Sequence, residues 1–217
     1  MKKVSYTLAA NWGRRFLILN LGLFLFAVGS IAVVQAGLGY VSWDVFHRGL
    51  SLHTPFTFGQ AGQLTGLIII GLGLLLGIKP GVGTVMNMLM IGFWDDQLLK
   101  WGWLPDGSKI GWWAALLLLG GGVLTIGLGS GLYIKAGMGA GPRDGFMLGL
   151  SARTGWRVAI CRTVIEISVC IVGFLLGGPL GIGTLVVALT IGPAVEFGFW
   201  CFRVQDPRHK PVLEVSA

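Results

Sequence analysis

The sequence predicts an all-α membrane protein of about six transmembrane helices, arranged as two three-helix repeats. Hydrophobic residues make up 54% of the chain and charged residues only 12%, whereas a soluble domain has about 25% charged residues. The sequence also repeats at an offset of 100 residues, because Ala36-Gly37 recurs as Ala136-Gly137 and the stretch 81–84 recurs as 181–184. Self-similarity of this kind indicates two copies of one module.

Each copy reads in the same order: a span, a glycine-rich break, a short helix, a second span, a tight turn and a third span. A bilayer core of about 30 Å requires roughly 20 apolar residues per helix. The segments that satisfy this are 16–36, 58–78, 82–99, 112–135, 157–177 and 181–202. The short helices, 43–52 and 143–152, are too short to span and are predicted to be re-entrant or interfacial.

These elements divide the chain into five parts. An odd number of spans per copy turns the second copy upside down, so we expect inverted repeats, as many secondary transporters have. The predicted parts are a cytoplasmic N-terminal segment (1–15), the first repeat (16–100), an external loop (101–111), the second repeat (112–202) and a cytoplasmic tail (203–217).

The breaks between the first span and the short helix are candidate hinges. Gly37 and Gly39 recur as Gly137 and Gly139, and glycine adopts backbone conformations that other residues avoid. Backbone N–H groups at the start of the third span, Gly81 to Thr84 and its copy, also form a potential anion site.

The formal net charge of +7 is a signal of topology and not of nucleic-acid binding. Lysine and arginine favour the cytoplasmic side of short loops. Basic residues gather before the first span, in the second and fourth connections and after the last span, while the other connections hold only Arg48, Lys100 and Lys109. Both termini are therefore predicted to be cytoplasmic.

Asp44 and Asp144 are the first candidates for a substrate or ion site. Both follow a break by five residues, at the head of a short helix. An aspartate there either stabilises the helix start or binds a cation, a proton or a substrate amine near the membrane centre. Repetition in both copies fits either role.

Further candidates are polar or ionisable residues within spans, where charge is costly and often functional. Arg162 and Glu166 lie one helical turn apart and form either a binding pair or a self-neutralising pair. Glu196 is near the end of the last span. The remaining candidates are Thr84, Thr184 and Asn87.

Other polar and aromatic residues are expected to be structural. Asp95 and Asp96 are predicted to reach the outer water, and Trp43 is assigned with most other tryptophans to the interfacial aromatic belt. His47 and His53 have no partner cluster for a metal. No nucleophile–base pair, phosphate loop or nucleotide motif occurs, so we expect no enzyme activity, no cofactor and no metal.

The stretch from Gly37-Leu38-Gly39 to Asp44, followed by Gly59 and by Gly81-Val82-Gly83-Thr84, resembles the YczE/YitT-type bacterial membrane proteins. The similarity covers about 16–202, although the second copy has Pro142-Arg143 where the first has Ser42-Trp43. The resemblance implies an integral plasma-membrane protein and identifies no substrate.

The predicted function is a small secondary transporter or exporter of a small molecule or ion. The alternative is a non-transporting scaffold that holds a partner protein through Arg143, Arg153, Arg157 and the C-terminal tail. The lipid bilayer is the expected environment, and a homodimer is one candidate assembly.

Overall fold

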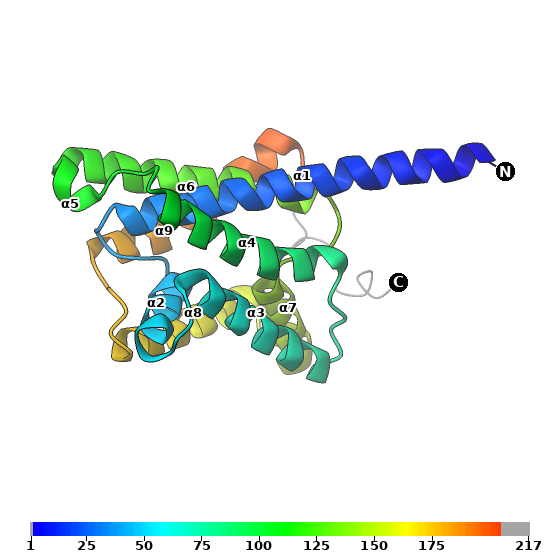
Figure 1. Cartoon of the computed structure of the whole chain (residues 1–217). Coiled ribbons are helices and arrows are strands. Elements are labelled where there is room, and N and C mark those ends of the chain that lie inside the picture. The colour runs from blue at the N-terminus through cyan, green and yellow to red at the C-terminus, as the bar shows by residue number, and fades with distance from the viewer. Residues whose placement is uncertain (1, 205–217) are drawn as a thin grey trace.

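The computed structural model describes residues 2–204, with side chains described for 11–158 and 160–204. Within these residues every regular element is a helix (Figure 1). The helices are α1 (Lys2–Gln35), α2 (Ser42–His53), α3 (Phe58–Leu75), α4 (Val82–Trp101), α5 (Gly107–Ile110), α6 (Trp112–Lys135), α7 (Pro142–Thr154), α8 (Val158–Leu175) and α9 (Ile182–Phe202). The prediction of an all-α protein is confirmed. The basic tail residues Arg208 and Lys210 lie outside the described part.

Four of these helices are long and apolar enough to cross a membrane: Asn11–Gln35 within α1, together with α3, α6 and α9. Large apolar side chains on their outer faces are exposed, including Leu67, Leu75, Leu117 and Leu189. Such a surface fits contact with lipid, because a soluble monomer rarely exposes a large contiguous apolar patch. The count of six spans stays a prediction.

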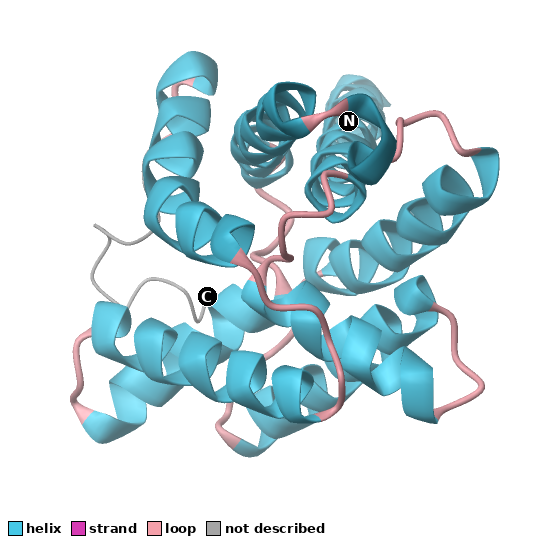
Figure 2. Ribbon diagram, turned by 90° about the vertical axis from the view of Figure 1, so that its left-hand side faces the viewer, coloured by secondary structure: helices cyan, strands magenta, loops and turns pink. Residues whose placement is uncertain are grey.

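Helices α1 and α6 pack against each other in opposite directions, at the centre of the upper layer in Figure 1. Small residues allow this close approach. A Cβ added to Gly29 would lie 2.6 Å from the Gly122 carbonyl oxygen, and one added to Gly129 would lie 2.8 Å from that of Gly22. Helix α4 flanks this pair on the α1 side and α9 on the α6 side (Figure 2).

In the lower layer, each short helix packs on a helix from the other half of the chain. Helix α2 packs on α8, and α7 packs on α3. A Cβ on Gly49 would lie 2.7 Å from the Gly173 carbonyl oxygen of α8, and Gly149 is correspondingly in contact with Ile78 at the end of α3. Each short helix is thereby held by the opposite half.

Arg15, in the N-terminal half of α1, contacts the end of α6. Its Nε donates to the carbonyl of Ala136 at 2.8 Å, and its Nη2 donates to that of Gly137. These are carbonyls at a helix C-terminus, where a cation is favourable.

Replacing Arg15 by glutamine should therefore destabilise the protein by about 2 kcal/mol, since hydrogen bonds to a charged donor are lost. Thermal unfolding in detergent measures this. Arg14→Gln is the matched control, because Arg14 is exposed and adjacent. Equal melting of the two variants would contradict the assignment.

Candidate functional site

The two glycine breaks dock onto the starts of the opposite third helices. Gly37 and Gly137 have φ of 69° and 62°, and Gly39 and Gly139 have φ of 121° and 120°. These are left-handed values that favour glycine. The Leu38 carbonyl accepts from the Gly183 N–H at 2.7 Å, and the Met138 carbonyl accepts from the Gly83 N–H, also at 2.7 Å.

These hydrogen bonds contradict the expected anion site. The Gly83 N–H at the start of α4 and the Gly183 N–H at the start of α9 each already donate to a backbone carbonyl. Thr84 completes the junction. Its hydroxyl donates to the Ala140 carbonyl at 2.7 Å and accepts from the Gly81 N–H at 3.1 Å.

Thr184 and Asn87 lie at the same two junctions. Thr184 accepts from the Gly181 N–H at 3.4 Å. Asn87 is next to Gly141. A Cβ added to Gly141 would lie 3.3 Å from the side-chain amide of Asn87. These candidates are therefore placed where the halves join, in contact with backbone.

Asp44 is buried, with 6% of its surface exposed. The N-cap of α2 is Val41 and has no side-chain cap hydrogen bond, so Asp44 is a first-turn residue and not the cap. Its carboxylate accepts from the Ser30 hydroxyl of α1 at 2.8 Å. Its other oxygen lies 3.4 Å from Nδ1 of His47, one turn further along α2.

His47 connects Asp44 to the other half of the chain. Its ring is 3% exposed, and its Nε2 lies 3.3 Å from Nη2 of Arg143 in α7. A guanidinium only donates, so Nε2 accepts and Nδ1 carries the proton that faces Asp44. This assigns a neutral imidazole from its partners. Arg143 therefore donates to His47, and His47 donates to Asp44, so each of the two contacts has one donor and one acceptor.

Arg143 is partly buried, and its guanidinium carbon lies 4.4 Å from the ring centroid of Trp43. This is a cation–π contact, which strengthens when water is excluded. Trp43 is itself only 4% exposed. Residues 43 and 143 occupy equivalent positions in the two copies, so equivalent residues face each other here. Asp44, His47, Arg143 and Trp43 are called the central cluster below.

Asp144 lies beside this cluster with a different partner. The Tyr133 hydroxyl of α6 donates to its carboxylate at 3.2 Å. Ser30 performs the corresponding role for Asp44, although its sequence equivalent is Ser130 and not Tyr133. The two aspartates are thus both held by hydroxyl groups, from α1 and α6 respectively.

The remaining candidates lie on α8 and α9. Arg162 and Glu166 approach each other within α8, with 3.6 Å between Nε and Oε1, and their side chains are 40% and 27% exposed. Glu196 is an exposed residue of α9. Among the described residues, Arg162 and Glu166 form no hydrogen bond or ion pair with Asp44 or Asp144, but Glu166 interacts electrostatically with Arg143.

Two sequence interpretations are wrong. Asp95 does not reach the outer water, since it is 4% exposed within α4. Trp43 is in the core and not in the aromatic belt, since it is 4% exposed. Sequence reasoning also missed the contact of His47 with Asp44, which their spacing of three residues on a predicted helix could have indicated.

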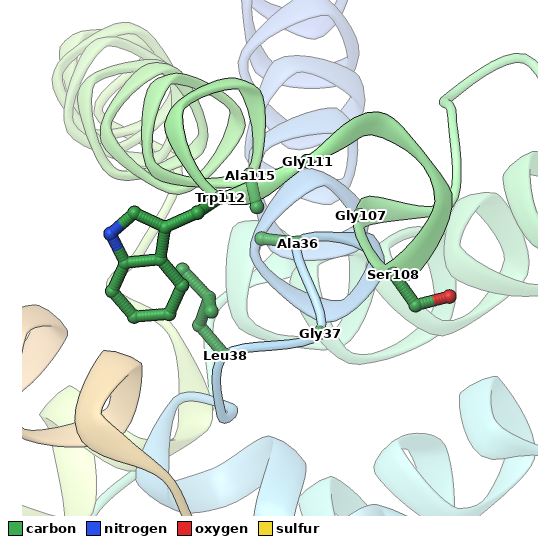
Figure 3. A pocket seen from close by; sticks show the side chains of 8 residues that line it. All are labelled: Ala36, Gly37, Leu38, Gly107, Ser108, Gly111, Trp112 and Ala115. Carbon is green, nitrogen blue, oxygen red and sulfur yellow. The ribbon is translucent and has the colours of Figure 1, made fainter.

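A separate hollow of about 230 Å³ opens beside Ala36 and Gly37 at the end of α1 (Figure 3). Leu38, Ala115 and Trp112 line it, and the Leu38 and Trp112 side chains stand on the same side in Figure 3. Apart from Gly37, it contains none of the candidate site residues, and its lining is mostly apolar. The central cluster, and not this hollow, holds the ionisable groups.

The loop of residues 102–111 lies next to this hollow and contains one carboxylate, that of Asp106. Asp106 accepts from the Ser108 hydroxyl at 2.7 Å and from the Ser108 N–H at 3.0 Å, and Lys109 lies 3.1 Å away. These partners, the Ser108 side chain first, lower the pKa of Asp106 to about 2. The loop carboxylate therefore stays ionised at any physiological pH and caps α5.

Comparison with known proteins places the chain among bacterial membrane proteins. A family described as "Family of unknown function (DUF6198)" matches residues 13–199. The uncharacterized membrane protein YczE of Bacillus subtilis is 34% identical over 178 residues, covering 81% of each chain. An uncharacterized protein of Haemophilus influenzae is 30% identical over 198 residues, covering 90% of this chain and 89% of its own length.

A third relative, the uncharacterized protein YyaS of Bacillus subtilis, is 25% identical over 189 residues. No solved structure matches the chain. The family match covers most of the sequence, and the description of YczE as a membrane protein agrees with the apolar helices of this chain. The chain is a member of the DUF6198 family and a YczE-like membrane protein.

Proposed function

We propose that this protein is a secondary transporter of a small molecule or ion, without enzyme activity, that works by alternating access around the central cluster. The observation that carries the proposal is an asymmetry. The pair α3 and α4 is equivalent in sequence to the pair α8 and α9. Helices α3 and α4 pack against each other, whereas α8 and α9 are separated.

A pseudo-two-fold relation between the halves supports this comparison. The contact of Gly29 with Gly122 is mirrored by that of Gly129 with Gly22. The Leu38–Gly183 hydrogen bond is mirrored by Met138–Gly83. Reciprocal contacts of this type are the mark of a two-fold axis. With three spans per copy, that axis lies in the membrane plane and passes between Trp43 and Arg143.

The packed pair is α3 with α4. A Cβ added to Gly59 would overlap the Gly92 carbonyl, and one added to Gly66 would lie 2.7 Å from Met88. Asp96 then fastens the ends of the pair, because it accepts from the Gly59 N–H at 2.8 Å and from the Thr57 hydroxyl. With cytoplasmic termini, this closed end faces outwards.

The equivalent pair, α8 with α9, is open in the described residues. A Cβ on Gly192, the counterpart of Gly92, would meet nothing within 4 Å. The packing of α3 on α4 has no counterpart between α8 and α9, and α9 stands apart from the lower layer in Figure 2. This asymmetry supports a conformation that is closed outside and open to the cytoplasm.

The alternate conformation follows from exchanging the roles of the halves. Helix α8 then packs on α9, and α3 separates from α4. The glycines of the breaks, which have positive φ, act as the hinges for this movement. Glu196 is the counterpart of Asp96 and Arg157 that of Thr57. We therefore expect Glu196 to approach Arg157 when the cytoplasmic side closes. The central cluster is exposed alternately to each side of the inner membrane.

Labelling of single cysteines with a membrane-impermeant maleimide tests this mechanism. Cys161, Cys170 and Cys201 are first replaced by serine or alanine. Thr163→Cys on α8 is exposed, whereas its counterpart Gln63 packs on α4 and donates to the Leu89 carbonyl at 2.9 Å. Thr163→Cys should react from the cytoplasmic side only, and Gln63→Cys from neither side.

A lipid-facing control separates an aqueous opening from simple exposure. Val172 lies on the opposite side of α8 and is 45% exposed, so Val172→Cys should stay unlabelled in the bilayer. If Thr163→Cys also stays unlabelled from both sides, lipid fills the space between α8 and α9. Alternating access would then be rejected.

A further inference from the structure

Asp95 of α4 is a buried carboxyl group that the central cluster does not use. Its Oδ1 has no hydrogen-bond partner among the described residues, and the side chain is 4% exposed. The adjacent Asp96 is different, since it accepts from Gly59 and Thr57. An ionised carboxylate without a partner is very costly away from water, and such a group takes up a proton instead.

The charged groups around Asp95 do not neutralise it. Its charged neighbours are Asp44 from α2, Asp96 on its own helix and Arg143 from α7. Helix α3 has no charged residue, and the charged residues of α1 whose side chains are described, Arg14 and Arg15, lie in its N-terminal half. Carboxylates therefore outnumber cations around Asp95.

The one cation in this group is already engaged. Arg143 stacks on Trp43 and donates to His47, while Asp44 accepts from Ser30. Asp144, beside Arg143 on α7, accepts from Tyr133. Each of these groups has its own partner, so no counter-charge is left in contact with Asp95.

We propose that Asp95 carries a proton in this conformation and that closure of the outer side of the transporter depends on this protonation, an inference that rests on the proposed function. When α3 separates from α4, water reaches the side chain. The carboxyl O–H bond then breaks, the proton passes to water and the carboxylate is left ionised. Closure of α3 on α4 requires the proton to return. Proton exchange is thereby tied to the outward-open conformation.

Infrared spectroscopy of the protein in lipid nanodiscs at neutral pH tests the protonation directly and needs no substrate. A protonated carboxylic acid has a carbonyl stretch above the amide band, which shifts in D₂O. The band should be present in the parent protein, absent from Asp95→Asn and unchanged in Asp96→Asn. Asp95→Glu should keep the band at a shifted frequency, which provides a readout if Asp95→Asn does not fold.

Two outcomes would overturn the proposal. The Asp95→Asn spectrum can retain the full band, which would place the proton elsewhere. Alternatively, sodium at constant pH can remove the band, which would make Asp95 a ligand of a metal cation. Neither outcome affects the labelling of Thr163→Cys, so a failure of the proton site is distinguishable from a failure of alternating access.

Discussion

Replacing Gly59 by alanine is expected to force α3 and α4 apart. The added Cβ would overlap the backbone carbonyl of Gly92, and backbone at a helix–helix contact moves only with the whole helix. Overpacking of this kind costs about 1–3 kcal/mol. Thermal unfolding of the purified protein should show the loss. In the bilayer, Gln63→Cys should become reactive from the outer side in the Gly59→Ala background.

Gly192→Ala is the matched control for this prediction. It makes the same glycine-to-alanine change at the counterpart of Gly92, the residue that Gly59 contacts, and nothing lies within 4 Å of the new atom there. Since alanine favours a helix over glycine by about 1 kcal/mol, Gly192→Ala should melt at or above the parent temperature. If the two variants melt alike, the close packing of α3 on α4 is not a feature of the protein in solution.

Replacing Arg143 by glutamine is expected to be the most damaging change in the central cluster. Its guanidinium both stacks on Trp43 and donates to His47, and its loss leaves the Asp44 carboxylate without a nearby cation. Removing one partner of a buried charged group costs about 3–5 kcal/mol. Thermal unfolding should detect this, and Arg143→Lys should recover only part of it because lysine lacks the planar fork.

A double-mutant cycle identifies the cause of that loss. If the unpaired Asp44 charge is responsible, Arg143→Gln combined with Asp44→Asn should be more stable than the sum of the two single effects predicts. Arg153→Gln is the control, because Arg153 is an exposed arginine on the same helix. Additive effects, or an equal loss in Arg153→Gln, would exclude the coupling of Arg143 to Asp44.

Local sequence patterns predicted the helices well. Glycine and proline at the breaks, together with apolar runs between them, define the ends of α3, α6 and α9 to within a few residues. The left-handed conformations of Gly39 and Gly139 follow from the same residues. The predicted short helices also occur, as α2 and α7. These features depend on interactions between neighbours in the chain.

The central cluster depends instead on contacts across about 100 residues. His47 approaches Arg143 only because α2 and α7 meet at the junction of the halves. Counted along the chain, Asp95 falls near the end of a predicted span, yet its side chain is buried in the interior. The departure of Arg143 from the repeat was visible, since tryptophan stands at the equivalent position. Only the packing of the fold, which brings Arg143 over the Trp43 ring, identifies that pair as neighbours.

The face-to-face placement of positions 43 and 143 has a consequence for the ancestry of the chain. If a single half had assembled as an antiparallel pair of identical subunits, the residue on the axis would have met its own copy. Two arginines there would repel, and two tryptophans would supply no charge. Joining duplicated halves in one polypeptide allows the two positions to diverge. The Arg143 guanidinium can then stack on the Trp43 ring. Two identical subunits could not form this contact, because both would carry the same residue at that position.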